Sequence, residues 1–127
     1  MKLERNFDSD EFRCKCKQCV DKKFPPEVLK HLKILAKQLQ MVRDAIGKPI
    51  VIYSGYRCQF HNTNVGGAKN SQHLLGIAAD IHIDGKSPKE VHALVEQLMD
   101  KDIIMQGGLG LYDSFVHYDY RGKRTRW

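Results

Sequence analysis

An apolar stripe between Pro26 and Gly47 constrains the fold of this chain more than any other part of the sequence. Its residues recur at spacings of four and three, which places them on one face of a helix; they are Val28, Leu32, Leu35, Leu39, Val42 and Ile46. Pro26 and Glu27 favour a helix start, and Gly47 followed by Pro49 is typical of a helix end. The pattern predicts one long amphipathic helix over residues 26–46.

Strands are predicted in four further segments, which are residues 49–54, 80–85, 107–112 and 115–120. The first is a run of β-branched and aromatic residues and predicts a buried strand. The last two are joined by a tight turn at 113–114. Because helices and strands do not alternate regularly, we predict an α+β fold with a small, mostly antiparallel sheet flanked by helices.

A second helix is predicted to begin after Ser87. Ser87 and Glu90 have the spacing of a capping box, and the proline between them suits the first helical position. Near the N-terminus, residues 6–13 predict an extended segment. Its aromatic residues, Phe7 and Phe12, are expected to pack against the core.

Length and composition predict one domain over residues 1–127, in which a cysteine-bearing segment (1–24) precedes a core (25–127). The first residues lack the apolar run of a secretion signal, and no window is long enough to span a membrane. We therefore expect a chain without an export signal of its own, made in the cytoplasm, or a domain of a larger exported protein. We also expect a monomer.

The net charge of +6 favours an anionic partner such as a bacterial cell wall, a membrane surface or nucleic acid, or it reflects a solubilising surface. The densest basic cluster lies in residues 121–126. No aromatic stacking platform or recognised motif accompanies it, so no nucleic-acid binding is expected.

Four cysteines form a second pattern, with Cys14, Cys16 and Cys19 close together and Cys58 far downstream. Such spacing lets thiolates converge on a metal, and Cys58 completes a possible four-thiolate site. Disulfides and reduced thiols are the alternatives. The sequence favours these alternatives over a metal, because C-x-C is a less usual zinc spacing than C-x-x-C.

A possible metal site is formed by His73, Asp80 seven residues later, and His117 far along the chain. Two imidazoles and one carboxylate can bind zinc and leave a fourth position for water, which is the arrangement of a catalytic zinc site. On periodicity alone, the favoured interpretation is that both histidines are hydrogen-bonded side chains of the core or its boundary.

Two nearby features suggest a cleft beside these residues. Arg57 lies at the end of the strand predicted over 49–54. The segment 61–70 is dense in turn-forming residues, is too long for a hairpin connection, and leads towards His73. Long ordered loops of this kind usually carry functional residues.

Short motifs distributed over nearly the whole chain carry a family resemblance. They are residues 54–58 (Ser-Gly-Tyr-Arg-Cys), 61–62, 65–68, 70–73, 76, 78–81, 107–110 and 115–117. Together they resemble the zinc D-Ala-D-Ala carboxypeptidase family, which also includes vancomycin-resistance dipeptidases and phage endolysins and shares its fold with the Hedgehog signalling domain. The resemblance extends from about Phe7 to Trp127.

This resemblance implies that His73, Asp80 and His117 are zinc ligands. It also implies that Arg57, sixteen residues before His73, holds the carboxylate of a substrate, for which a guanidinium fork is suited. The alternative for Arg57 is a structural salt bridge with Asp80 or Asp119.

The chain departs from the family pattern at the general base. Many relatives carry an acid three residues before the late histidine ligand, where this sequence has Ser114. We predict Asp113, one residue earlier in the turn, as the base, because a turn accommodates such a shift. Asp119 is expected to orient His117. Asp119 or His82 is the next candidate for the base.

The sequence thus predicts a zinc metallopeptidase that hydrolyses D-amino-acid-containing bonds of peptidoglycan stem peptides, as a carboxypeptidase or an endolysin-like endopeptidase acting at the bacterial cell wall. The alternative is an inactive zinc-bound relative that binds cell-wall fragments or a protein partner. The sequence does not decide whether a terminal or an internal bond is cleaved.

Overall fold

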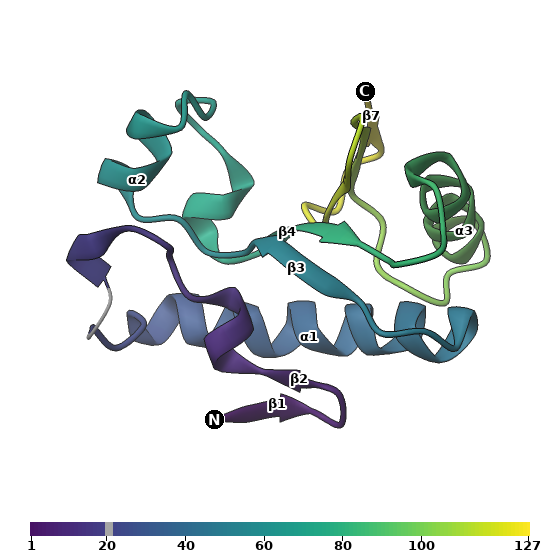
Figure 1. The fold of residues 1–127 in the computed structure, drawn as a ribbon, viewed down its shortest axis with the longest axis horizontal. Coiled ribbons are helices and arrows are strands. Elements are labelled where there is room, and N and C mark those ends of the chain that lie inside the picture. Colours follow the sequence, from purple (N-terminus) through teal and green to yellow (C-terminus); the bar gives the residue numbers. More distant parts are fainter. Residues whose placement is uncertain (20–21) are drawn as a thin grey trace.

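In the computed structural model, which describes residues 1–19 and 22–127, helix α1 (Pro26–Ile46) lies lengthwise along one side of the molecule (Figure 1). Gly47 ends the helix in the left-handed conformation, with a φ of 70°. The apolar stripe faces the core, where Leu32, Leu35, Leu39 and Val42 are fully buried. The predicted helix and both of its ends are confirmed.

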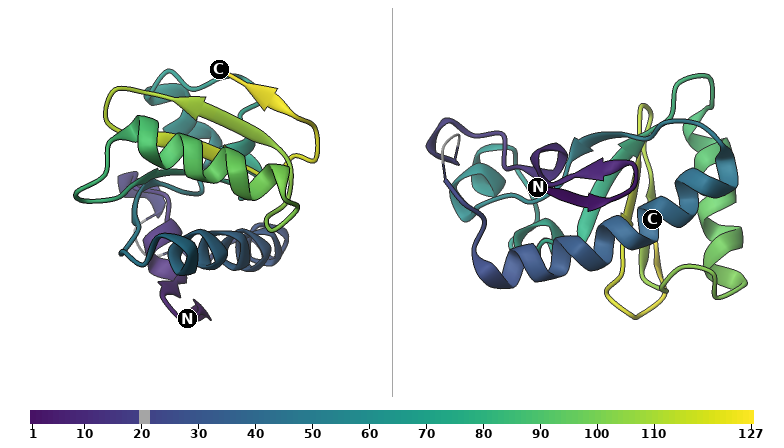
Figure 2. Two further views of the ribbon diagram at one scale, coloured as in Figure 1. Left: turned by 90° about the vertical axis from the view of Figure 1, so that its right-hand side faces the viewer. Right: turned by 90° about the horizontal axis from the view of Figure 1, so that it is seen from below.

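A five-stranded sheet in the order β3-β4-β6-β5-β7 forms the second layer. Its strands are β3 (Val51–Ser54), β4 (Ala78–His82), β5 (Gly108–Leu111), β6 (Val116–Asp119) and β7 (Thr125–Arg126). Neighbours are antiparallel except β5 and β7. Helix α3 (Pro88–Asp100) packs against β5 and β6 (Figure 2). The predicted α+β fold, with a mostly antiparallel sheet flanked by helices, is confirmed.

The N-terminal segment is more ordered than the extended chain predicted over 6–13. Strands β1 (Lys2–Glu4) and β2 (Phe7–Asp8) form a hairpin, and the short 3-10 helices η1 (Ser9–Phe12) and η2 (Lys17–Cys19) follow. Asp8 caps η1, because its side chain accepts the N–H of Asp10 while Glu11 accepts the N–H of Asp8. Phe7 and Phe12 are buried in the core, as predicted.

Strand β3 corrects the prediction of a fully buried strand. Ile52 is buried, whereas Val51 and Tyr53 are each 41% exposed. The reason is the position of β3 at the edge of the sheet, where one face meets solvent. Strand β4 lies earlier in the chain than the predicted 80–85, since it begins at Ala78 and ends at His82.

The predicted loop over 61–70 is partly helical. Helix α2 (Gln59–Asn64) occupies its first part and lies on the far side of β3 and β4 from α1 (Figure 1). Cys58 caps this helix, because its sulfur accepts the N–H of His61 at 3.4 Å. A cysteine is not a usual cap residue, so the helix start was not visible in the sequence.

Helix α3 begins with the predicted capping box, in which Ser87 accepts the N–H of Glu90 and Glu90 accepts the N–H of Ser87. Val91, Val95, Leu98 and Met99 form its buried face. Within the part of the chain that the structure describes, no helix is both long enough and apolar enough to cross a lipid bilayer.

Replacing Ser87 by alanine is expected to lower the free energy of unfolding by about 1 kcal/mol, because the N–H of Glu90 loses its acceptor. Urea denaturation measures the change. Ser114→Ala, in the exposed turn between β5 and β6, is the matched control and should shift stability by less than about 0.5 kcal/mol. Equal losses in both variants would contradict the capping role.

Candidate metal centre

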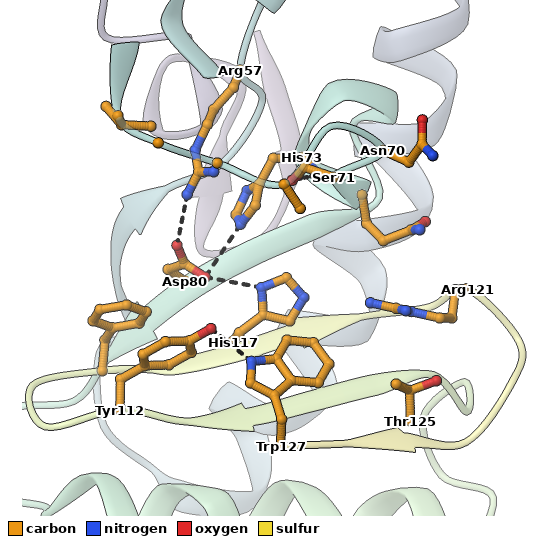
Figure 3. A pocket seen from close by; sticks show the side chains of 16 residues that line it. Arg57, Asn70, Ser71, His73, Asp80, Tyr112, His117, Arg121, Thr125 and Trp127 are labelled. Atoms are coloured by element: carbon orange, nitrogen blue, oxygen red, sulfur yellow. Dashed lines mark hydrogen bonds and ion pairs between the residues drawn. The ribbon is translucent and has the colours of Figure 1, made fainter. Parts of the chain in front are cut away.

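His73, Asp80 and His117 meet in one pocket, as the sequence predicts (Figure 3). His73 lies in the 3-10 helix η3 (Gln72–Leu75), Asp80 on β4 and His117 on β6. Oδ1 of Asp80 is 3.3 Å from Nε2 of His73 and 3.1 Å from Nδ1 of His117. All three side chains are buried, and the atoms that could bind a metal lie within 4.8 Å of one another.

Backbone geometry explains why these side chains meet. Asp80 and His117 are direct cross-strand partners in the β4–β6 ladder, and side chains at such positions project from the same face. Ser71 caps η3 by accepting the N–H of His73. Gly76 closes η3 with a φ of 79°, where an added Cβ would lie 2.9 Å from Val28. Serine and glycine therefore fix the backbone from which the His73 side chain projects.

The outer nitrogen of each imidazole has a partner of its own. Nδ1 of His73 donates to the carbonyl of Gly55 at 2.7 Å, and Nε2 of His117 donates to Oδ2 of Asp119 at 2.7 Å. A neutral imidazole has one N–H, so each inner nitrogen presents a lone pair to Asp80. When both rings are neutral, three acceptors face one another without a donor between them. This donor set fits a metal cation, and metal-bound histidines are commonly oriented by such outer bonds.

The charged groups of the site stabilise one another. Burial opposes ionisation of Asp80, but its hydrogen bonds with His117 and His73 outweigh that cost and lower the pKa of the carboxyl well below its usual range. Burial likewise opposes the charged form of His117, yet the bonds with Asp119 and Asp80 outweigh it and raise the pKa of this imidazole.

Asp119 is completely buried beneath the site. Its Oδ1 accepts the N–H groups of Gly108 and Arg121 as well as Nε of Arg121, and its Oδ2 accepts Nη2 of Arg121 and Nε2 of His117. Burial raises the pKa of Asp119, but the bonds from His117, Arg121 and Gly108 outweigh it and keep the carboxyl ionised. The structure thus places Asp119 where the sequence predicts, against the outer nitrogen of His117.

Arg57 lies beside Asp80 at the edge of the site. Nη2 of Arg57 is 3.2 Å from Oδ2 of Asp80, Nε donates to Ser54, and Nη1 donates to Asn62. The sequence allows a salt bridge from Arg57 to Asp80 or to Asp119, and the structure shows the pair with Asp80. Three of the five guanidinium N–H groups are used in this way, and two remain for a ligand.

The site opens into a pocket of about 530 Å³. One wall is formed by residues 65–68 and 70–72, and the facing wall by Tyr112, Phe115, Arg121 and Trp127 (Figure 3). The ring centroid of Trp127 lies 4.9 Å from that of His117, and the indole N–H donates to the hydroxyl of Tyr112 at 2.6 Å. Sequence reasoning missed Tyr112 and Trp127 as site residues, since aromatic side chains give no spacing signal of their own.

Asp113 is not brought to this pocket. It is exposed and lines a separate depression with Ser87, Pro88 and Lys89. His82 is also elsewhere, stacked on Tyr53 and paired with Asp84. Among the described residues that line the metal pocket, Asp80 is the sole carboxylate. The identity of the general base remains a prediction.

Two imidazoles and one carboxylate, buried at the base of an open pocket and with both outer ring nitrogens bonded, define a mononuclear metal site of the type used by hydrolases. A sequence profile described as peptidase M15 matches residues 5–119. The chain therefore belongs to the peptidase M15 family. This confirms the resemblance carried by the sequence motifs.

A curated relative is the zinc D-Ala-D-Ala carboxypeptidase of Streptomyces albus G. It is 51% identical over 45 residues, which is 35% of this chain and 18% of that protein. The match thus spans less than a fifth of the relative's length.

Proposed function

We propose that this chain is a zinc peptidase that hydrolyses bonds in the D-amino-acid-containing stem peptides of peptidoglycan. Membership of the peptidase M15 family and the similarity to a zinc D-Ala-D-Ala carboxypeptidase support this function. The observation that carries it is the convergence of three possible metal-ligand atoms, from His73, Asp80 and His117, at the base of an open pocket. Such a chain would act at the bacterial cell wall as a monomer.

In this proposal His73, Asp80 and His117 hold the zinc, which when bound supplies an acidified water and polarises the scissile carbonyl. The protein's own groups set the geometry: the carbonyl of Gly55 and the carboxylate of Asp119 fix the two rings. The aromatic wall of the pocket offers an apolar surface for the substrate backbone and limits the access of water.

Arg57 is proposed to bind a substrate carboxylate with its two remaining N–H groups while it holds Oδ2 of Asp80 with a third. The peptide would then lie with its carboxylate near Arg57 and its scissile bond over the metal. This arrangement favours cleavage next to a carboxylate-bearing residue, either the terminal D-alanine or a residue within the stem.

The proposed general base remains Asp113, with Asp119 as the competing candidate. Asp113 would need a movement of the 113–114 turn to reach the pocket, since in the structure it lines another depression. Asp119 is already bonded to His117, so its role would be exerted through that ring. Asp113→Asn with unchanged zinc content and reduced kcat would support Asp113 as the base. Unchanged kcat in this variant would exclude it.

Arg57→Lys is expected to lower kcat/KM for carboxylate-ended peptides by about 10- to 100-fold, because charge-assisted hydrogen bonds contribute about 1.5–3 kcal/mol. The measurement compares each peptide with its C-terminal amide. A role in substrate binding predicts a loss confined to the carboxylate form. Equal losses for both forms, with less bound zinc, would show that Arg57 only positions Asp80. Arg5→Ala, in an exposed pair with Asp44, is the matched control.

The proposed function is tested by digesting defined peptidoglycan with the full chain and identifying the products by mass spectrometry, with and without a chelator. Chelator-sensitive release of D-alanine would establish a carboxypeptidase, and new internal ends would establish an endopeptidase. Intact muropeptides under all conditions would rule out the enzyme.

A second candidate function is a zinc-bound protein without catalytic activity, which binds wall fragments or a protein partner. One observation favours it: Asp80 is the sole carboxylate among the described residues that line the pocket. In this case muropeptides would bind to the protein in a zinc-dependent manner and would not be hydrolysed.

A further inference from the structure

Four cysteine side chains meet in a second cluster, apart from the metal centre described above. The thiol cluster consists of Cys14, Cys16, Cys19 and Cys58, whose sulfur atoms all lie within 4.8 Å of one another. Cys14 and Cys16 are buried, and Cys19 and Cys58 are partly buried. All four are free thiols in the structure. None of them takes part in the function proposed above.

The spacing of the sulfur atoms is that of a tetrahedral metal site. Sγ of Cys14 is 3.6 Å from Sγ of Cys16 and 3.7 Å from Sγ of Cys58, and the last two are 3.5 Å apart. Four sulfurs around zinc, each at a Zn–S distance of about 2.3 Å, are separated by about 3.8 Å. The three measured edges thus come close to one face of such a tetrahedron, with Cys19 in position to supply the fourth corner.

Disulfide pairing does not account for this arrangement. A disulfide brings two sulfurs together and leaves other cysteines free to lie anywhere, whereas here three sulfurs are mutually equidistant within 0.2 Å. Thiol groups are weak hydrogen-bond donors and give little reason to gather. A divalent cation provides that reason, because it binds four thiolates at once.

Backbone donors surround the cluster in the way that thiolates require. The N–H of Cys58 points to Sγ of Cys14 at 3.4 Å, and the N–H of His61 points to Sγ of Cys58 at 3.4 Å. Hydrogen bonds of this kind stabilise negative charge on sulfur. Arg13, Lys22 and Lys23 line the depression beside the cluster, and their positive charges offset the net negative charge of a four-thiolate zinc site.

We propose that Cys14, Cys16, Cys19 and Cys58 form a structural zinc site, separate from the histidine-containing centre. Four protein ligands leave no open position, so this zinc takes no part in hydrolysis. It joins the N-terminal segment to the start of α2. Cys58 follows Arg57 directly, and the N–H of Tyr56 donates to the carbonyl of Phe12 at 2.9 Å, so the metal fixes the segment from which Arg57 reaches the pocket.

Metal analysis of the reduced full chain tests the proposal. The wild-type protein should contain about two zinc ions per chain, and His73→Ala, which removes a ligand of the other centre, should retain about one. The same variant loaded with Co²⁺ should show the intense thiolate-to-cobalt charge-transfer absorption of a tetrahedral sulfur site. Cys14→Ser combined with Cys16→Ser should lose this absorption together with one zinc.

The His73→Ala measurements decide the matter even if the cysteine variant does not fold. Absence of zinc from purified His73→Ala, together with a cobalt spectrum that lacks thiolate charge transfer, would overturn the proposal. An intact mass lower by the hydrogens of one or two disulfides in the wild-type chain would overturn it as well. Because neither measurement uses peptide hydrolysis, failure of the proposed function would leave this test unaffected.

Discussion

Replacing His73 by alanine is expected to lower the rate of peptide hydrolysis by about 10³-fold or more. A catalytic metal contributes several kcal/mol of transition-state stabilisation, and each 1.4 kcal/mol is a factor of about ten in rate. His73 is the suitable ligand to change, because its outer partner is a backbone carbonyl and its loss leaves the network of Asp119 intact. The rate is measured on defined muropeptides, with bound zinc determined in parallel.

His92→Ala is the matched control for this experiment. His92 lies on α3, away from the residues that line the metal pocket, and alanine preserves the helix. The control should keep both its rate and its zinc. If His73→Ala instead hydrolyses at the wild-type rate, the assignment of the centre is wrong. Treating the wild-type protein with a chelator should reproduce the loss, and adding zinc should restore activity.

The sequence was sufficient to predict which three residues meet at the centre but not the reason that they meet. The spacing of His73 and Asp80 is local, and it indicates a metal motif once His117 is added. That Asp80 and His117 are opposite one another depends on the register of β4 and β6, which is a long-range property. The carbonyl of Gly55 gives no signal at all, because every residue carries a carbonyl.

Side-chain direction in a turn is equally hidden from the sequence. Asp113 is two residues from Phe115, which lines the pocket, yet its own side chain lies in another depression. Periodicity fixes a direction on strands and helices, whereas each turn position has a direction of its own. The segment 61–70 was predicted as a loop, although helix α2, which Cys58 caps, occupies its first part.

The cysteines show how a structure can support an interpretation that spacing alone disfavours. The close spacing of Cys14 and Cys16 made a metal the less favoured interpretation, since that spacing is unusual for zinc. Distances that include Cys58, more than forty residues away, support the zinc site proposed above. The two centres would then act on the same segment, 54–58. The proposed thiolate site would bind Cys58, and Arg57 contacts Asp80 of the histidine-containing centre.

Replacing Asp119 by asparagine is expected to lower the free energy of unfolding by about 3–5 kcal/mol, the usual cost of removing one partner of a buried ion pair. The amide retains one oxygen for Gly108 and the backbone of Arg121. Its NH₂ group would face the donors of Arg121 and His117, so two donors lose their acceptor. Zinc affinity at the histidine-containing centre should fall by about 10- to 100-fold, because the ring of His117 loses its orienting bond.

The pH dependence of stability provides an independent check on Asp119. Its carboxyl pKa is lowered in the folded protein, so the stabilisation is fully present above the unfolded pKa of about 3.9 and is lost as the pH falls below it. Asp119→Asn should therefore lose less stability than the wild type when the pH is lowered from about 5 to about 2.

Urea denaturation of the metal-free proteins gives the stabilities, and competition with a chelating indicator gives the zinc affinities. Asp113→Asn is the matched control, since this acid is exposed in a turn, and it should change stability by less than about 0.5 kcal/mol with zinc affinity unchanged. A wild-type zinc affinity in Asp119→Asn would show that the bond from Asp119 does not orient His117. A loss of zinc affinity in Asp119→Asn but not in Asp113→Asn assigns the orienting role to Asp119, because both substitutions replace a carboxylate by an amide.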